Sequence, residues 1–166
     1  MDAKYQNLLP LVSKYKEEMA AVQIRRTLWN KQTKALIQKS FKEFIDAFSL
    51  PCYIDIEDGL LHQEAIFLAF DDEETGIVLK SKNQMMIQSG GGLVYHQNAN
   101  GKIQCMFILP YIEGIKGEKG VTRDIGAFKP EDIDESLILS HIHKFFKEIL
   151  EWECFLREPI GFKRNS

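Results

Sequence analysis

The sequence predicts an α+β fold, and the distribution of glycine and proline is the first observation that predicts it. All 11 glycines lie after residue 58, and ten of them fall between Gly59 and Gly126. Residues 11–50 and 131–158 contain neither glycine nor proline. Glycine costs about 1 kcal/mol inside a helix and is typical of tight turns. We therefore expect one domain: a helical arm (1–50), an antiparallel sheet (51–128), a C-terminal helix (129–158) and a short tail (159–166).

The second observation is an apolar periodicity of three and four residues near the N-terminus, which indicates a heptad seam. The helix that carries it is expected to begin near Leu9, because Pro10 is tolerated only in a first turn, and to end before Leu50-Pro51. The phase of the apolar stripe shifts near Trp29-Asn30. The seam consists of Tyr5, Leu8, Val12, Tyr15, Met19 and Val22.

A continuous helix of this length would span about 60 Å. A compact domain of this size has a radius of gyration of only about 15 Å. Two alternatives follow. Either the helix breaks near Trp29 and folds into a helical hairpin, or it protrudes and pairs with another chain.

The middle of the chain predicts four to six antiparallel strands in meander order, packed against the C-terminal helix. Residues 52–57 alternate in polarity and lead into Asp58-Gly59, a hairpin signal. The acidic residues 71–76 are expected to form a turn, and residues 102–112 the strongest strand. Gly90, Gly91 and Gly92 indicate a bulge or wide loop, although such a run could also let a ligand approach the backbone.

The third observation is the last glycine-free stretch, where Pro130 followed by acidic residues predicts a helix start. Its apolar stripe covers more than half of the helix circumference, so we expect cover from the sheet on one side and from the first helix on the other. The stripe consists of Ile138, Ile142, Phe145, Ile149, Trp152 and Leu156.

Composition and charge exclude several functional classes. The net charge of −3 gives no electrostatic footprint for nucleic acid. The sequence has no apolar run that would span a membrane and no signal peptide, so we expect a cytoplasmic protein. Cys52, Cys105 and Cys154 have neither the spacing of a metal site nor nearby basic partners, and are expected to be buried free thiols. No metal ion and no cofactor are expected.

Besides the triple glycine, two groups of residues are candidate ligand sites. His62 and His96 could form a cluster with Asp55 and Glu57 if their strands were neighbours, although these carboxylates are equally explained as the solvated face of a sheet. Lys116, Lys119 and Arg123 could hold an anion in a loop. His141 and His143 point about 200° apart on a helix and cannot share a metal ion. No catalytic residue is assigned.

Our leading functional hypothesis is a non-catalytic interaction, adaptor or assembly protein. It would form a homodimer, or bind another protein, through Leu8, Val12, Tyr15, Met19 and Val22, without binding nucleic acid or membrane. The second hypothesis is a module that binds a small molecule or an anion in a pocket between the sheet and the C-terminal helix. The third is an enzyme that uses the His62, His96, Asp55 and Glu57 cluster.

Overall fold

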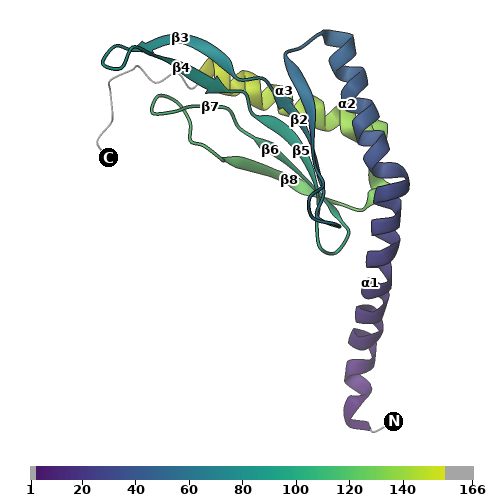
Figure 1. The fold of residues 1–166 in the computed structure, drawn as a ribbon. Coiled ribbons are helices and arrows are strands. Elements are labelled where there is room, and N and C mark those ends of the chain that lie inside the picture. The colour runs from purple at the N-terminus through teal and green to yellow at the C-terminus, as the bar shows by residue number, and fades with distance from the viewer. Residues whose placement is uncertain (1–2, 156–166) are drawn as a thin grey trace.

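A computed structural model describes residues 3–155 and has the expected α+β architecture (Figure 1). A long N-terminal helix is followed by two antiparallel sheets and a C-terminal helix. The first part of the long helix projects away from the sheets, and the C-terminal helix runs along one face of the larger sheet (Figure 1).

The N-terminal helix is continuous, so of the two alternatives the helical hairpin is wrong. The backbone keeps right-handed helical angles through Leu28, Trp29, Thr33 and Lys34. A single π-helical turn contains the extra residue that shifts the phase of the apolar stripe, as π-bulges do. The helix ends at Ser49, which adopts a left-handed conformation (φ 50°). Its consecutive segments are η1 (Ala3–Leu8), α1 (Leu9–Leu28), η2 (Trp29–Thr33) and α2 (Lys34–Phe48).

The strands form two antiparallel sheets rather than one. In the larger sheet, the spatial order is β1-β2-β5-β6-β8, a meander with other strands inserted between its members. The order of the smaller sheet is β3-β4-β7. The larger sheet comprises β1 (Cys52–Glu57), β2 (Ala65–Phe70), β5 (Gly92–Gln97), β6 (Ile103–Ile108) and β8 (Thr122–Phe128), and the smaller one β3 (Glu73–Leu79), β4 (Gln84–Ser89) and β7 (Tyr111–Ile112).

Two expectations about turns need correction. The β1–β2 hairpin forms, but its connection runs over residues 58–64 rather than through a tight Asp58-Gly59 turn. Residues 73–76 of the acidic segment belong to β3 rather than to a turn. Glu73 and Glu74 pair with Gln88 and Ile87 of β4 before the register shifts, so the exposed glutamates are compatible with a strand.

The C-terminal helix α3 (Glu135–Phe155) begins later than Pro130 predicts. Pro130 opens a separate 3₁₀ turn, η3 (Pro130–Asp132), after which Ile133 is extended and buried. The Oδ1 atom of Asp134 accepts a hydrogen bond from the backbone N–H of Leu137 at 2.7 Å and caps the helix. Residues 156–158 of the expected helix, including Leu156, and the tail lie outside the described residues.

The hydrophobic core lies between the larger sheet, α3 and the second half of the long helix. Alternate residues of β2, β5 and β6 face α3, as the two-residue period of a strand requires. The α2 helix packs beside α3, where the rings of Phe44 and Phe146 are 5.4 Å apart. The fully buried apolar residues of this core include Trp29, Ile37, Phe41, Ile66, Leu68, Leu93, Tyr95, Ile103, Cys105, Ile138 and Phe145.

Candidate functional site

The N-terminal helix is fixed to the sheets at its π-helical turn. The buried Trp29 donates its indole N–H to Oε2 of Glu64 at 2.9 Å, and Lys34 donates to the same oxygen at 2.8 Å. Burial alone would raise the pKa of Glu64, but the hydrogen bonds from Lys34 and Trp29 outweigh it and hold the pKa below its usual value. Glu64 therefore stays ionised and joins the helix to the start of β2.

One turn earlier, the β5–β6 turn (98–101) closes against the same helix. Arg26 donates to the carbonyl of Ala99 at 3.0 Å, and Arg25, which is 5% exposed, donates to that of Asn100 at 3.3 Å. A Cβ at Gly101 would lie 2.7 Å from Cβ of Arg25 and 3.1 Å from the carbonyl oxygen of Val22. Only glycine permits this approach, so the sheets hold the helix from Val22 onward.

Residues 4–21 extend beyond this anchor, and we call them the arm. At the rise of an α-helix, the arm is roughly 30 Å long, and it projects clear of both sheets (Figure 1). Residues 4–20 are all exposed, and only Ala21 is half-buried. Its exposed apolar side chains are Tyr5, Leu8, Leu9, Leu11, Val12, Tyr15 and Met19, which are each 44–65% exposed.

The structure places four of the five expected interface residues on the exposed arm. Leu8, Val12, Tyr15 and Met19 are open to solvent, whereas Val22 is half-buried beside Gly101. The heptad seam found in the sequence is thus an uncovered stripe of the single chain.

The expected histidine–carboxylate cluster is not assembled. His96 and Glu57 point to the same face of the sheet, but Ala65 of β2 lies between them in register. Two strand spacings separate their backbones by about 10 Å. His62 lies in the β1–β2 loop with a positive φ of 65°. Across residues 3–155 we find no group of three or more His, Cys, Asp or Glu side chains able to hold a metal ion.

The triple glycine is packed inside the larger sheet where the chain passes from β4 to β5. Gly91 has φ +72°, and a Cβ there would lie 2.5 Å from the carbonyl oxygen of Ile108. A Cβ at Gly90 or Gly92 would also meet the backbone of β2 or the residue after it, at 2.6 and 2.9 Å. The glycines therefore bring neighbouring backbones together.

The three basic residues of the expected anion site have separate surroundings. Arg123 on β8 pairs with Glu148 of α3, with 3.1 Å between Nε and Oε2. Lys119 is exposed in the β7–β8 connection. Lys116 places its ammonium 3.8 Å from the ring centroid of Trp152 and donates to the backbone carbonyl of that residue.

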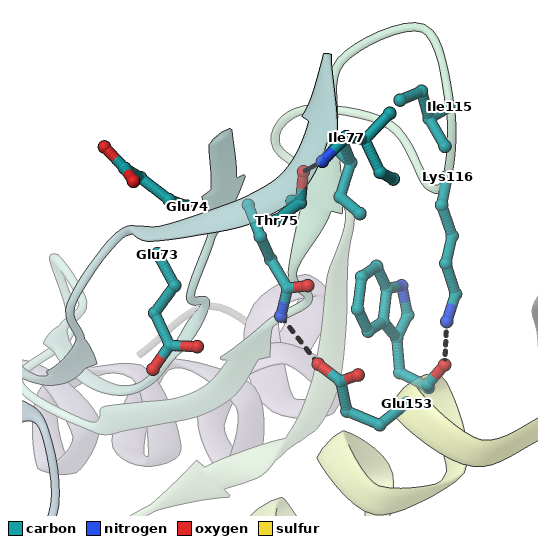
Figure 2. A pocket seen from close by; sticks show the side chains of 10 residues that line it. Glu73, Glu74, Thr75, Ile77, Ile115, Lys116 and Glu153 are labelled. Carbon is teal, nitrogen blue, oxygen red and sulfur yellow. Dashed lines mark hydrogen bonds between the residues drawn. The ribbon is translucent and has the colours of Figure 1, made fainter. Parts of the chain in front are cut away.

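Lys116 also lines a cavity of about 490 Å³ between the smaller sheet and the end of α3 (Figure 2). Figure 2 shows Glu73 and Thr75 reaching from β3 and Glu153 from α3, with Ile115 and Lys116 on the side opposite Glu73. Gln88 donates to Oε1 of Glu153 at 2.6 Å. The lining consists of Glu73, Glu74, Thr75, Ile77, Gln88, Ile112, Ile115, Lys116, Trp152 and Glu153.

The charge of this lining favours a cation over an anion, because the carboxylates of Glu73 and Glu153 outnumber the ammonium of Lys116, whereas Glu74 points away from the cavity (Figure 2). A second cavity of about 410 Å³ adjoins it and shares Ile115, Lys116 and Trp152. The sequence indicated Trp152 as a buried residue and Lys116 as a ligand candidate. It did not indicate Glu73 and Glu74, because they were assigned to a turn, or Glu153, which was assigned only to the C-terminal helix.

A buried polar cluster was also missed from the sequence. His141 of α3 lies with its Nδ1 atom 2.7 Å from the Tyr95 hydroxyl and 3.4 Å from the Cys105 thiol. Burial lowers the pKa of His141 to about 4, with Lys144 contributing, and burial raises the pKa of Cys105 to about 12. Both groups are therefore uncharged at neutral pH, and Cys105 is not activated as a nucleophile.

The remaining cysteines differ in exposure. All three thiols are free, but only Cys105 is buried, whereas Cys52 is half-buried and Cys154 is exposed. The expectation of three buried thiols is thus wrong for Cys154. This residue lies near the end of α3, on the exposed side of the helix, whereas Trp152 two positions earlier faces inward.

The buried histidine makes stability depend on pH. Its folded pKa of about 4 lies below the unfolded value of about 6.5, so its contribution is complete above pH 6.5 and declines as the pH falls toward 4. Between pH 7.5 and pH 5, this should lower the free energy of unfolding by about 2 kcal/mol. Urea unfolding of His141→Gln should show a pH dependence weaker by that amount. An equal pH dependence in both proteins would mean that His141 is not held neutral.

In comparisons with known proteins, no family model, curated protein or solved structure matches the chain. Within residues 3–155, none of the helices has the length and apolar character that crossing a bilayer demands. The function must therefore be inferred from the surfaces described above.

Proposed function

We propose that the protein is a non-catalytic assembly or adaptor protein that forms a homodimer through its arm. The observation that supports this proposal is the exposed heptad stripe on a helix that projects beyond the sheets. The contacts that fix the helix at the base of the arm also support the proposal. Because Glu64, Asn100 and Ala99 hold the helix rigidly, the arm is presented in one direction at little entropic cost.

The apolar area exposed on the arm is close to that of a standard protein–protein interface. Seven large apolar side chains on the arm are about half exposed, and each can bury on the order of 100 Å². Their sum, roughly 700 Å² per chain, approaches the area of about 800 Å² per partner in a standard interface. Solvent-exposed apolar stripes of this extent are rare in monomers.

Charges placed in the seam should separate the two chains. Val12→Glu combined with Met19→Glu would bury unpaired carboxylates in the contact, each at a cost of several kcal/mol. Light scattering at micromolar concentration should show a fall from twice the chain mass of 19.2 kDa to that mass. Circular dichroism should show that the sheets remain folded.

The matched control is Ser13→Glu combined with Ala20→Glu. It introduces the same two charges at the same spacing, one residue further along the exposed helix and outside the seam. This variant should keep the mass of the unmodified protein. Equal dissociation of both variants, or of neither, would contradict the assignment of the interface to the seam.

The cavity at Trp152 supports a second candidate, the binding of a small organic cation. The carboxylates of Glu73 and Glu153 in its wall suit a guanidinium or ammonium group. Titration with N-acetylargininamide should shift the indole N–H resonance of Trp152. Glu153→Gln should weaken this binding and Glu151→Gln, an exposed neighbour on α3, should not. An unchanged resonance at millimolar ligand would exclude this candidate.

A further inference from the structure

We infer that the two arms pair antiparallel, so that the tip of each arm lies against the sheets of its partner at the base of the partner's arm. The inference rests on the proposed homodimer and adds to it the direction of pairing and a second contact surface.

The direction follows from where the seam leads. Tyr5, Val12 and Met19 share one heptad position, and Leu8, Tyr15 and Val22 share the other. Seven residues after Val22, the second position falls on Trp29, which is fully buried in the core of its own chain. Val22 itself lies beside the β5–β6 turn. The face that is open on the arm is therefore covered by the chain's own sheets at the base.

This covering distinguishes the two pairings. In a parallel dimer, the partner helix would continue alongside Val22 and Trp29, where the β5–β6 turn and the core already lie. In an antiparallel dimer, the partner's arm ends at this level. The seam matches itself in that direction: Leu8 meets the partner's Met19, Val12 meets the partner's Tyr15, and Tyr5 ends level with the partner's half-buried Val22.

The apolar surface at the tip supports the same direction. Leu9 and Leu11 widen the stripe beside Leu8 and Val12, whereas from residue 13 to residue 21 the large exposed apolar side chains are Tyr15 and Met19 alone. A two-helix seam covers only a narrow stripe, so the wider tip needs further cover.

The base offers that cover. In the β1–β2 loop, Leu60 is 66% and Leu61 is 70% exposed. The same loop ends at Glu64, whose carboxylate accepts the hydrogen bond from Trp29. The carbonyl of Glu64 accepts a hydrogen bond from the backbone N–H of Gln97, which adjoins the β5–β6 turn. Both loops lie at the end of the sheet from which the arm emerges (Figure 1). In the antiparallel dimer, the tip of one arm reaches these leucines on the other chain.

Disulfide cross-linking tests the direction. Leu8→Cys and Met19→Cys are made separately in a chain in which Cys52 and Cys154 are replaced by serine, and the mass of each variant is confirmed by light scattering. In the antiparallel dimer, two copies of position 8, or of position 19, lie about 16 Å apart along the axis, beyond the reach of a disulfide. Position 8 of one chain lies beside position 19 of the other.

A refolded mixture of the two variants should therefore form cross-linked dimers on oxidation at least roughly tenfold faster than either variant alone. A mixture of Ser13→Cys and Ala20→Cys, which lie outside the seam, should not. Rapid cross-linking of Leu8→Cys alone and of Met19→Cys alone would show parallel arms, which overturns this inference and leaves the homodimer intact. A dimer that cross-links in no sample, or a monomer in solution, would overturn both proposals.

Discussion

Replacing Trp29 with alanine is expected to lower the free energy of unfolding by about 4–5 kcal/mol, at the upper end for large-to-small core substitutions. The side chain is fully buried at the junction of the long helix, β2 and the core. Its loss would leave a cavity and would remove one of the two donors to the buried carboxylate of Glu64. Urea unfolding followed by circular dichroism measures the change.

Trp29→Phe separates these two contributions. It retains most of the apolar volume but has no N–H, so it should cost about 1–3 kcal/mol, the loss of one hydrogen bond to a charged group that still accepts from Lys34. A loss below about 1 kcal/mol for Trp29→Ala would show that the π-helical turn is not the anchor of the arm.

The second large effect is expected at Gly91, where alanine should cost about 3 kcal/mol. Gly91 has φ +72°, a conformation that costs roughly 1 kcal/mol or more for a residue with a side chain. In addition, the new Cβ would lie 2.5 Å from the carbonyl oxygen of Ile108, so the β5–β6 pairing must shift. Thermal or urea unfolding gives the cost directly.

Gly114→Ala provides a matched control. Gly114 has the same φ of +72°, but nothing lies within 4 Å of its Cβ position. Its substitution should therefore cost only the conformational part, about 1 kcal/mol. Equal costs at both positions would show that Gly91 is required for its backbone conformation alone and that the close packing of the glycine run contributes nothing.

Local sequence signals were sufficient for the element types. The glycine distribution separated the helices from the sheet region, and the phase shift of the apolar stripe located the π-helical turn at Trp29. The sequence did not reveal how the shift is absorbed, because a break and a π-bulge change the periodicity alike. The contacts of Trp29 with Glu64, 35 residues away, favour the continuous helix.

Features that depend on distant segments were not predictable. The assignment of β3, β4 and β7 to a second sheet depends on pairing between segments that are distant in the sequence. The C-terminal helix does not begin at Pro130, because Ile133 is extended and buried in the core. In the buried polar cluster, His141 of α3 contacts Tyr95 and Cys105 of the larger sheet, which precede it by 46 and 36 positions. No sequence spacing marks such a cluster.

The candidate sites show the same division. The exposed seam was found from the sequence because it is a local periodicity on one helix. Of the eight candidate ligand residues, only Lys116 lines the cavity. The other walls of the cavity come from β3, β4, β7 and α3, which are distant from one another in the sequence. His62 and His96 were proposed on the assumption that their strands were adjacent to those of Asp55 and Glu57, and β2 separates His96 from both.

The mass of the unmodified protein in solution tests the central claim most directly. Sedimentation equilibrium over a range of micromolar concentrations should give twice the chain mass of 19.2 kDa, with dissociation only at the lowest concentrations. A mass of 19.2 kDa throughout the range would show that the exposed arm does not associate with a second copy, and would contradict the homodimer.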